Sequence, residues 1–512
     1  MPEQTVASRT DPIAVIDIGS NSGRVVVFER DGTSQLRLLT GSRAALRLVH
    51  DVDTAARLTD ATMARTMEAL RDFDAIARRA GAKRIVTVAT AAMRDAGNGA
   101  QFAERVRREL GLRIDIIDGP AEARYGFAGA VRGLAVSNGL LFDIGGGSMQ
   151  ITRFARRRLA DAVSLPLGAL RLSDRFLRSD PPGGKQLRHL RRHVRNCLTD
   201  AGVRRLTATD RLVGTGGTLR NVAKIDREAR RYPIGSLHGY ALPVDRLAEV
   251  IDRLATIKKK RRDEIPGLSA ERADSIVGGA IAVHALAEFV GAEHILVSGH
   301  GVREGVALRL LNIAMAAPDA VREASLSSLV SRFDGWDHAA ATRRRDIAGA
   351  LYRALERRAS ARVAKAIDHA AWVVDIGRSL DVVNRHRHTA EIVLTAELPG
   401  FEHDDLALIA AVVRRAGDRH ARVASLPAVA DAIDSGLLER AAVILALADE
   451  IERRCPGGRH VVLDCEVGRH VTLSVPSLPS WLAKDLDRRF EHAFGRPLIV
   501  RRDASGLKRV AG

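Results

Sequence analysis

Two short segments of this chain are nearly identical and consist of residue types that bind anions. Asp17-Ile-Gly-Ser-Asn-Ser22 returns as Asp143-Ile-Gly-Gly-Gly-Ser148, and each copy lies between two apolar runs. This pattern predicts a strand, a tight turn and a second strand, with an aspartate near the end of the first strand. Backbone N–H groups and hydroxyls of such turns converge on one point, where an anion binds. Two copies indicate two lobes that face each other across a cleft and hold phosphate between them.

The phosphate-binding candidates are residues of these two turns and of a third glycine-rich turn. Three consecutive glycines weaken a plain strand by roughly 0.5–1 kcal/mol each. A phosphate site therefore explains them better than a simple structural turn does. The candidates are Ser20, Asn21, Ser22, Gly145, Gly146, Gly147, Ser148, Gly216, Gly217 and Thr218.

The two aspartates occupy matched places in the repeated segment. A carboxylate at a strand end beside phosphate typically holds Mg²⁺, directly or through water. Each aspartate could instead cap its own turn by accepting backbone N–H groups. We favour the metal role for Asp143 and leave both roles open for Asp17.

Glu122 is the candidate for proton chemistry. It follows Asp118-Gly119-Pro120, a typical helix start, and so falls in the first turn of a helix. A glutamate there commonly does no more than complement the helix dipole, and the residues alone favour that interpretation. The same dipole also keeps the carboxylate ionised, as a water-activating base in phosphoryl transfer must be.

Composition restricts the partners of the chain. The 512 residues carry a formal net charge of +18, with 80 Lys and Arg against 62 Asp and Glu. This charge fits either a solvated arginine-rich surface or attraction for a polyanion. Aromatic residues make up only 4% of the chain, which argues against base stacking on single-stranded nucleic acid. The polar N-terminus and the lack of an apolar run of about 18–20 residues predict a cytoplasmic protein without a membrane span.

Glycine turns at strand ends, repeated along the chain, predict an α/β fold with the site at those ends. The length predicts several domains. We expect a first lobe over 11–135, a second lobe over 136–313, a helical domain over 320–447 and a small α+β module over 448–512. In that module, strands are expected at His460–Cys465, His470–Val475 and Pro497–Arg501, and a helix at Trp481–Phe494.

Taken together, these segments resemble the exopolyphosphatase and guanosine pentaphosphate phosphatase family. The resemblance spans roughly residues 13–310 and rests on the two repeated segments, Ala89-Thr90 with Arg94, Glu122-Ala-Arg124, Gly216-Gly-Thr218 and Arg303-Glu-Gly305. It implies two ribonuclease-H-like lobes around a cleft, the fold of sugar kinases, heat-shock chaperones and actin. It also implies Mg²⁺-dependent removal of terminal phosphate from inorganic polyphosphate or guanosine pentaphosphate.

The resemblance assigns roles to individual residues. Glu122 matches the catalytic glutamate, Asp143 the metal-linked aspartate, and Arg94 an arginine near the phosphate channel. The three turns match phosphate-binding loops. Gln150 stands where members often carry a glutamate, so this expected metal contact brings no charge.

The helical domain resembles HD-type phosphohydrolases, but Val374-Asp375 stands where a His-Asp pair belongs. We therefore predict a domain without a working metal site, in which His386 and His388 are surface residues. For long members the resemblance implies a homodimer.

An exopolyphosphatase is the leading hypothesis. The alternatives are a guanosine pentaphosphate 5′-phosphatase, a binding or sensor protein for polyphosphate or guanosine tetraphosphate, an ATP-using relative, and a nucleic-acid-binding protein, although no specific nucleic acid is expected.

Overall fold

The structure is a computed structural model that describes residues 10–356, 358–421, 434–455 and 461–502. Contacts divide it into two compact units. The first comprises Met1–Arg231 with Ser236–Ser328, and the second comprises Tyr232–Gly235 with Leu329–Gly512. Within the described ranges, no helix is both long enough and apolar enough to cross a membrane.

The first lobe is built on a five-stranded sheet in the order β3-β2-β1-β4-β5. The strands β1, β2 and β3 pair antiparallel, whereas β4 and β5 run parallel to β1. The elements are β1 (Ile13–Ile18), β2 (Ser22–Arg30), β3 (Leu36–Ala45), α1 (Leu48–Ala55), α2 (Asp60–Arg79), β4 (Arg84–Ala89), α3 (Ala91–Asp95), α4 (Gly99–Leu110), β5 (Ile114–Ile116) and α5 (Gly119–Arg132).

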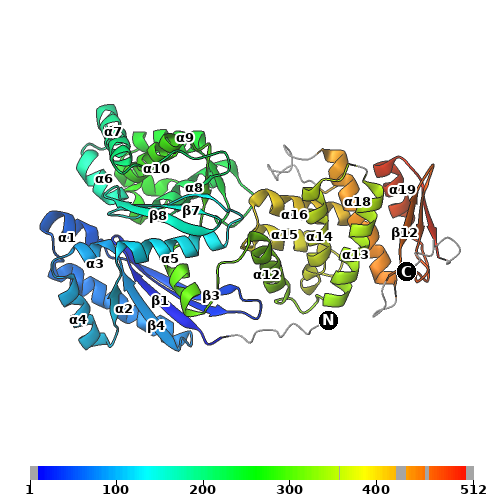
Figure 1. The fold of residues 1–512 in the computed structure, drawn as a ribbon, viewed down its shortest axis with the longest axis horizontal. Coiled ribbons are helices and arrows are strands. Elements are labelled where there is room, and N and C mark those ends of the chain that lie inside the picture. The colour runs from blue at the N-terminus through cyan, green and yellow to red at the C-terminus, as the bar shows by residue number, and fades with distance from the viewer. Residues whose placement is uncertain (1–9, 357, 422–433, 456–460, 503–512) are drawn as a thin grey trace. The chain divides into compact units, whose positions relative to one another are not determined.

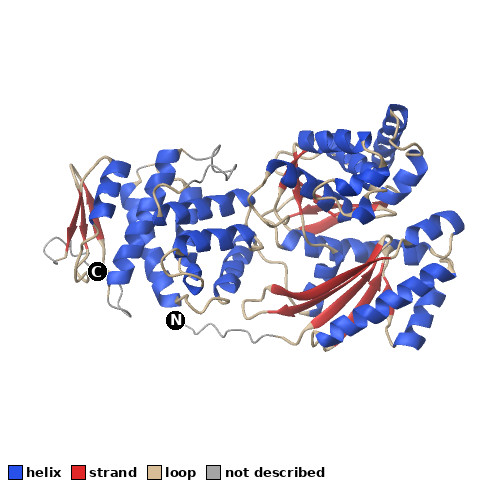
Figure 2. Ribbon diagram, turned by 180° about the vertical axis from the view of Figure 1, so that it is seen from behind, coloured by secondary structure: helices blue, strands red, loops and turns tan. Residues whose placement is uncertain are grey.

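The second lobe repeats this topology in a six-stranded sheet, β10-β11-β9-β6-β7-β8. Figure 2 shows the strands of both lobes in red. Strands β8-β7-β6-β9-β11 have the order and directions of β3-β2-β1-β4-β5. Its elements are β6 (Gly139–Ile144), β7 (Met149–Ala155), β8 (Arg158–Leu165), α6 (Ala169–Phe176), α7 (Gly184–Asp200), β9 (Arg211–Thr215), α8 (Gly217–Arg230), β10 (Ala241–Pro243), α9 (Val244–Thr256), η1 (Lys259–Glu264), η2 (Ala270–Arg272), α10 (Ile276–Val290), β11 (His294–Val297) and α11 (Val302–Leu310). The expected pair of ribonuclease-H-like lobes is therefore confirmed.

The lobes exchange one helix each. The apolar side of α5, with Phe127 and Val131, packs on the sheet of the second lobe, whereas Val306 and Leu308 of α11 pack on the sheet of the first. The ribbon shows α5 running between the two lobes (Figure 1). Glycine lets the two helices approach closely, because a Cβ on Gly305 would lie 1.9 Å from the Tyr125 carbonyl oxygen. This contact fixes the helix that carries Glu122 between the lobes.

The second unit is mainly helical, as expected, and ends in a small sheet with the order β12-β13-β14. Its elements are α13 (His338–Leu355), α14 (Ala361–Val373), η3 (Ile376–Ser379), α15 (Arg385–Thr395), α16 (His403–Gly417), α18 (Ser435–Arg454), β12 (Asp464–Val467), β13 (Val471–Ser474), α19 (Lys484–Phe494) and β14 (Leu498–Arg501), with α12 (Pro318–Val330) at the boundary of the units.

The strand expected at 460–465 is shifted. β12 begins at Asp464, opposite Ser474, and His460 lies outside the described residues. Residues 461–463 have no partner strand, because Pro476 follows the end of β13 and has no N–H to continue the pairing.

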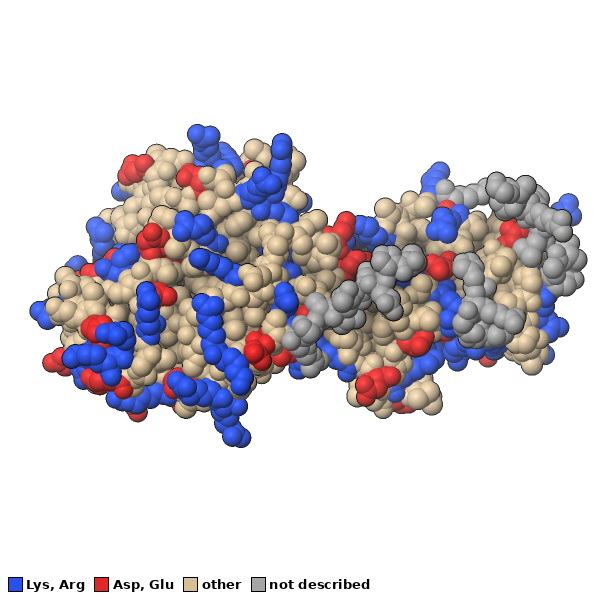
Figure 3. Space-filling view, turned by 60° about the horizontal axis from the view of Figure 1, so that its bottom comes forward, with Lys and Arg blue, Asp and Glu red and all other residues tan. Residues whose placement is uncertain are grey.

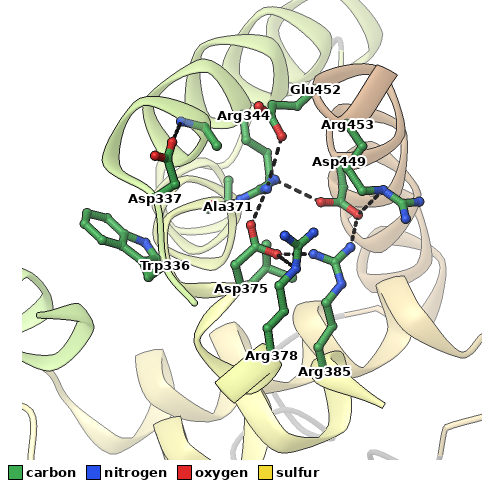
Figure 4. A network of polar contacts seen from close by, with 12 residues as sticks. Trp336, Asp337, Arg344, Ala371, Asp375, Arg378, Arg385, Asp449, Glu452 and Arg453 are labelled. Atoms are coloured by element: carbon green, nitrogen blue, oxygen red, sulfur yellow. Dashed lines mark hydrogen bonds and ion pairs between the residues drawn. The ribbon is translucent and has the colours of Figure 1, made fainter. Parts of the chain in front are cut away.

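Asp375, which stands where HD-type phosphohydrolases carry the aspartate of their His-Asp pair, belongs to a buried charge network (Figure 4). Asp375 accepts from Arg344 at 2.5 Å and also pairs with Arg378 and Arg385. Asp449 pairs with the same Arg344, Nε to Oδ1 at 3.0 Å, and with Arg385. Guanidinium groups thus hold both carboxylates.

His386 and His388, expected on the surface, are both half-buried. The His386 ring packs between α15 and α16, where a Cβ on Gly417 would lie 2.6 Å from its Cβ. Burial lowers the pKa of His386 to about 4, so the ring is neutral at neutral pH.

Candidate functional site

The two repeated turns have the same local geometry. In the first, the Gly19 amide donates to the Ser22 carbonyl at 3.1 Å, and in the second the Gly145 amide donates to the Ser148 carbonyl at 2.9 Å. Each turn joins the two antiparallel strands at the centre of its lobe, β1 to β2 and β6 to β7. We call them phosphate loop 1 (residues 19–22) and phosphate loop 2 (residues 145–148).

The two loops come together in space. A Cβ on Gly146 would lie 3.5 Å from the Cβ atoms of both Ser20 and Asn21. A Cβ on Gly147 would lie 3.6 Å from the Ser20 hydroxyl oxygen and 3.2 Å from Val49. The glycines of loop 2 therefore leave room for loop 1, and the loops approach as the repeat predicts.

Between the lobes lies a cavity of about 130 Å³. Its walls contain most of the residues singled out in the sequence, namely Asp17, Ser20, Asn21, Ser22, Glu122, Asp143, Gly145, Gly146, Ser148, Gln150, Gly216 and Gly217. Three others lie behind the wall. Gly147 faces Val49, Thr218 is buried at the start of α8, and Arg94 lies behind Glu122.

Glu122 reaches the cavity from the first turn of α5. The helix begins as the sequence predicts, because the Asp118 side chain accepts from the Ala121 amide at 2.7 Å and Pro120 stands in the first turn. Arg94 donates through Nη1 to the Ile117 carbonyl at 2.8 Å and to Glu122 Oε2 at 3.3 Å. The arginine thus holds the carboxylate in a fixed direction.

Burial raises the pKa of Glu122 to about 7. The Arg94 charge opposes this shift, whereas the nearby Asp143 carboxylate adds to it. A carboxyl whose pKa lies near neutral pH can both accept and release a proton under physiological conditions. Such a group beside a cleft is characteristic of a general base.

Asp17 and Asp143 lie at equivalent positions of their strand pairs, opposite Arg24 and Gln150 respectively. Burial raises the pKa of both carboxyls, and the Asp17 charge adds to the rise in the pKa of Asp143. Within the described part of the chain, neither carboxylate has a hydrogen bond or an ion pair shorter than 4.0 Å. Carboxylates left without partners in a cleft are suited to a divalent cation.

Gln150 lies beside these carboxylates with its amide nearly enclosed. Only 7% of the residue is exposed, and Nε2 is buried without a hydrogen-bond partner. The side-chain oxygen offers a neutral ligand of the kind that Mg²⁺ accepts. The donor set of two carboxylates and one amide oxygen therefore fits Mg²⁺.

Four arginines of the cavity wall were not among the expected site residues. They are Arg24, Arg220, Arg272 and Arg303, although Arg303 belongs to a segment that carried the family resemblance. Burial, together with the charges of neighbouring arginines, lowers the pKa of Arg24 to about 9 and that of Arg272 to about 10. Like charges collected in a cleft repel one another unless an anion binds between them.

Arg272 is the clearest example of an arginine in this cavity that requires an anion. The residue is 5% exposed, and its Nε and Nη1 atoms are buried without hydrogen-bond partners. Gly217 makes room for it, because a Cβ there would lie 2.3 Å from the Arg272 Nη2 atom. Two sequence signals could have pointed to the group: Arg24 lies two residues after Ser22 on the same strand face, and Arg220 lies in the first turn after the third glycine turn.

This arrangement can hold a phosphate chain end and direct a water at it. Loop amides and arginines offer donors for phosphate oxygens, and Glu122 offers an acceptor for a water proton. The fold and the site together define a two-lobed, phosphate-binding α/β protein with the parts needed for phosphoryl transfer to water.

Comparison with known proteins identifies the family of this chain. Residues 25–314 match the Ppx/GppA phosphatase family, and residues 321–468 match domain III of Ppx/GppA phosphatases. The chain therefore belongs to the Ppx/GppA phosphatase family, as the sequence segments indicated.

Two named relatives and one solved structure agree with this family assignment. Exopolyphosphatase 1 of Mycobacterium leprae is 32% identical over 304 residues, which cover 59% of this chain and 89% of the relative. Exopolyphosphatase 2 of Mycobacterium tuberculosis is 31% identical over 313 residues, or 58% of this chain and 98% of the relative. The crystal structure of the Aquifex aeolicus Ppx/GppA family member has a TM-score of 0.53 at 26% identity and covers 60% of this chain and 98% of its own.

Proposed function

We propose that the protein is an exopolyphosphatase, which hydrolyses the terminal phosphate from inorganic polyphosphate with Mg²⁺ as cofactor. The observation that carries the proposal is the meeting of both phosphate loops with Glu122 in one cavity. Two relatives, the mycobacterial exopolyphosphatases 1 and 2, bear this activity in their names.

The chain's own residues account for substrate binding. The amides and hydroxyls of loops 1 and 2 orient the phosphate at the chain end, and Arg24, Arg220 and Arg272 neutralise its oxygens. Asp17, Asp143 and Gln150 would hold Mg²⁺, which supplies further neutralisation of phosphate charge when bound. The third glycine turn, with Gly216 and Gly217, keeps the backbone close to the anion.

Glu122 supplies the proton chemistry. Its ionised carboxylate accepts a proton from a water that lies in line with the terminal phosphorus–oxygen bond. Arg94 keeps that carboxylate pointed at the cavity. Because the transition state of phosphoryl transfer is loose, orientation of the water contributes more than basicity does.

The net positive charge suits a polymeric anion. Lys and Arg side chains are spread over the face seen in Figure 3, with Asp and Glu between them. A positive field raises the capture rate of an acidic ligand by roughly 10–10³. The same field would attract guanosine pentaphosphate, which offers the same terminal phosphate.

Glu122→Gln tests the proposal directly. The variant keeps the size of the side chain but cannot accept the proton, so phosphate release from long polyphosphate should fall at least ~100-fold. Polyphosphate should still bind, which equilibrium binding in Mg²⁺ would measure. Glu109→Gln, on the exposed face of α4, is the matched control and should release phosphate normally. Near-normal turnover by Glu122→Gln would refute the role of this residue.

The same assay separates the alternatives. A kcat/KM higher on guanosine pentaphosphate than on polyphosphate would make the protein a guanosine pentaphosphate 5′-phosphatase. Tight binding without phosphate release at saturating Mg²⁺ would make it a sensor.

The remaining parts of the proposal concern location and assembly. We place the protein in the cytoplasm. We also propose that it forms a homodimer, which sedimentation of the full chain would test. We regard the helical unit as an HD-like domain that has lost its metal site, since Arg344 and Arg385 pair with Asp375 and Asp449.

A further inference from the structure

Ion pairs cross between the lobes beside the two phosphate loops. Arg171 of α6, in the second lobe, donates from Nη2 to Asp53 Oδ1 at 2.6 Å, and its Nε lies 3.2 and 3.1 Å from the two carboxylate oxygens. Asp53 belongs to α1 in the first lobe. Arg47 and Arg43 of the first lobe pair in turn with Asp274, at 3.4 Å, and Glu271 of the second. We call these three contacts the cross-lobe ion pairs.

The segments that carry these ion pairs also hold the phosphate loops. In the first lobe, the amides of Leu46 and Arg47 donate to the Asn21 carbonyl at 2.9 Å each, and the Val49 amide donates to the Ser20 carbonyl at 3.0 Å. α1 begins directly after Arg47. The helix that carries Asp53 is therefore continuous with the support of loop 1.

The second lobe has the same construction. The Ala169 amide donates to the Gly145 carbonyl at 2.9 Å, and the amides of Leu170 and Arg171 donate to the Gly146 carbonyl at 3.0 and 3.2 Å. Arg171 thus supports loop 2 through its backbone and reaches α1 through its side chain. The remaining acids, Glu271 and Asp274, flank Arg272, the buried arginine of the cavity wall.

We propose that the cross-lobe ion pairs are positioning contacts that set the spacing of the two phosphate loops, with Asp53–Arg171 as the principal one. The inference rests on the proposed function only in naming polyphosphate as the ligand. The pairs bias the lobes toward the closed arrangement, in which both loops and Arg272 reach the same phosphate chain end.

The solvent exposure of the Asp53 and Arg171 side chains determines how strongly their ion pair affects substrate binding. The Arg171 and Asp53 side chains are 27% and 31% exposed, so solvent screens their attraction. A lower population of closed molecules weakens apparent binding in proportion, whereas saturating substrate restores closure. Breaking the pair should therefore raise KM about two- to fivefold and leave kcat within about twofold.

Two single charge reversals separate this role from general attraction of the anion. Asp53→Arg adds positive charge, and Arg171→Glu removes it. If the residues acted only through the long-range field, Asp53→Arg would lower KM and Arg171→Glu would raise it. Positioning predicts that both raise KM for polyphosphate, and that the double variant Asp53→Arg/Arg171→Glu returns it to within about twofold of the parent.

Matched controls are available inside the first lobe. Arg105 and Glu109 form an ion pair within α4, with Nε and Oε1 2.6 Å apart. Arg105→Glu and Glu109→Arg change the net charge as the test variants do, and they should leave KM unchanged.

A second readout is independent of catalysis. Hydrogen exchange of the backbone amides in 45–53 and 166–174 of the full chain should be faster in each single reversal and return to the parent rate in the double variant. If the parent releases no phosphate, the proposed function fails, and these exchange rates still decide the present inference. Unchanged exchange in both single variants, or a double variant no better than the singles, would overturn it.

Discussion

Asp17 and Asp143 occupy the same position in two copies of one strand pair, yet they face different partners. Asp17 lies opposite Arg24, whereas Asp143 lies opposite Gln150. The first lobe thus places a cation beside its aspartate, and the second places a neutral amide there. In the proposed site, this asymmetry favours Asp143 as the main carboxylate ligand of a divalent cation, and it makes the first lobe better suited to phosphate.

The asymmetry predicts the effect of Gln150→Glu. A carboxylate beside Asp143 adds a charged oxygen ligand, so the Mg²⁺ concentration for half-maximal phosphate release should fall about three- to tenfold. Titration of activity with Mg²⁺ measures this change. The exposed Gln101→Glu on α4 adds the same charge far from the cavity and should leave the midpoint where it is. A higher midpoint in Gln150→Glu would mean that the amide, not a carboxylate, is what the site requires.

The pH dependence of activity follows from Glu122. Its pKa of about 7 means that the base is protonated at lower pH, so kcat/KM should rise with pH and level off above about 7. Because the Arg94 charge lowers this pKa against the effect of burial, Arg94→Met should move the rising limb to higher pH. A pH–rate profile of both proteins, at fixed Mg²⁺ and ionic strength, provides the comparison. An unshifted limb in Arg94→Met would show that another group controls the rate.

The contribution of Glu122 to the free energy of unfolding should fall as the pH rises, whereas the activity should increase. The folded-state pKa of Glu122 lies above the ordinary value of 4.5, so the folded protein binds this proton more tightly than the unfolded chain does. The contribution of Glu122 to stability is therefore fully present below about pH 4.5 and is lost as the pH rises through about 7. In Glu122→Gln this component of the pH dependence should disappear.

Arg344 is expected to be essential for the helical unit. It is fully buried and holds Asp375, Asp449 and Glu452. Arg344→Met leaves buried carboxylates without one of their charge partners, so the unfolding free energy of this unit should fall by about 3–5 kcal/mol. Denaturant unfolding followed by circular dichroism would detect the loss. Arg387→Met, which breaks only an exposed contact with Glu391 on one helix, should change stability little.

The local sequence was sufficient to predict the two repeated turns and the place of Glu122 at the start of a helix. Repeated glycine–serine segments between apolar runs leave the backbone few alternatives to a strand, a turn and a strand, and Asp118 with Pro120 specifies the start of the helix that carries Glu122. The helical character of the second unit also agreed with the sequence. Boundaries were less certain, as the start of β12 at Asp464 shows, because strand ends depend on the partner strand.

The sequence by itself therefore determined which residues could bind phosphate and activate water, since their chemistry and spacing are local properties. Only the tertiary structure decided which arginine side chains lie beside these residues. Arg24, Arg220, Arg272 and Arg303 come from four separate segments, and no periodicity links them. The partnership of Asp53 with Arg171 is likewise a property of lobe packing. Long-range pairing of charges depends on how whole elements dock, and the interactions that fix this docking are spread over many residues far apart in the chain.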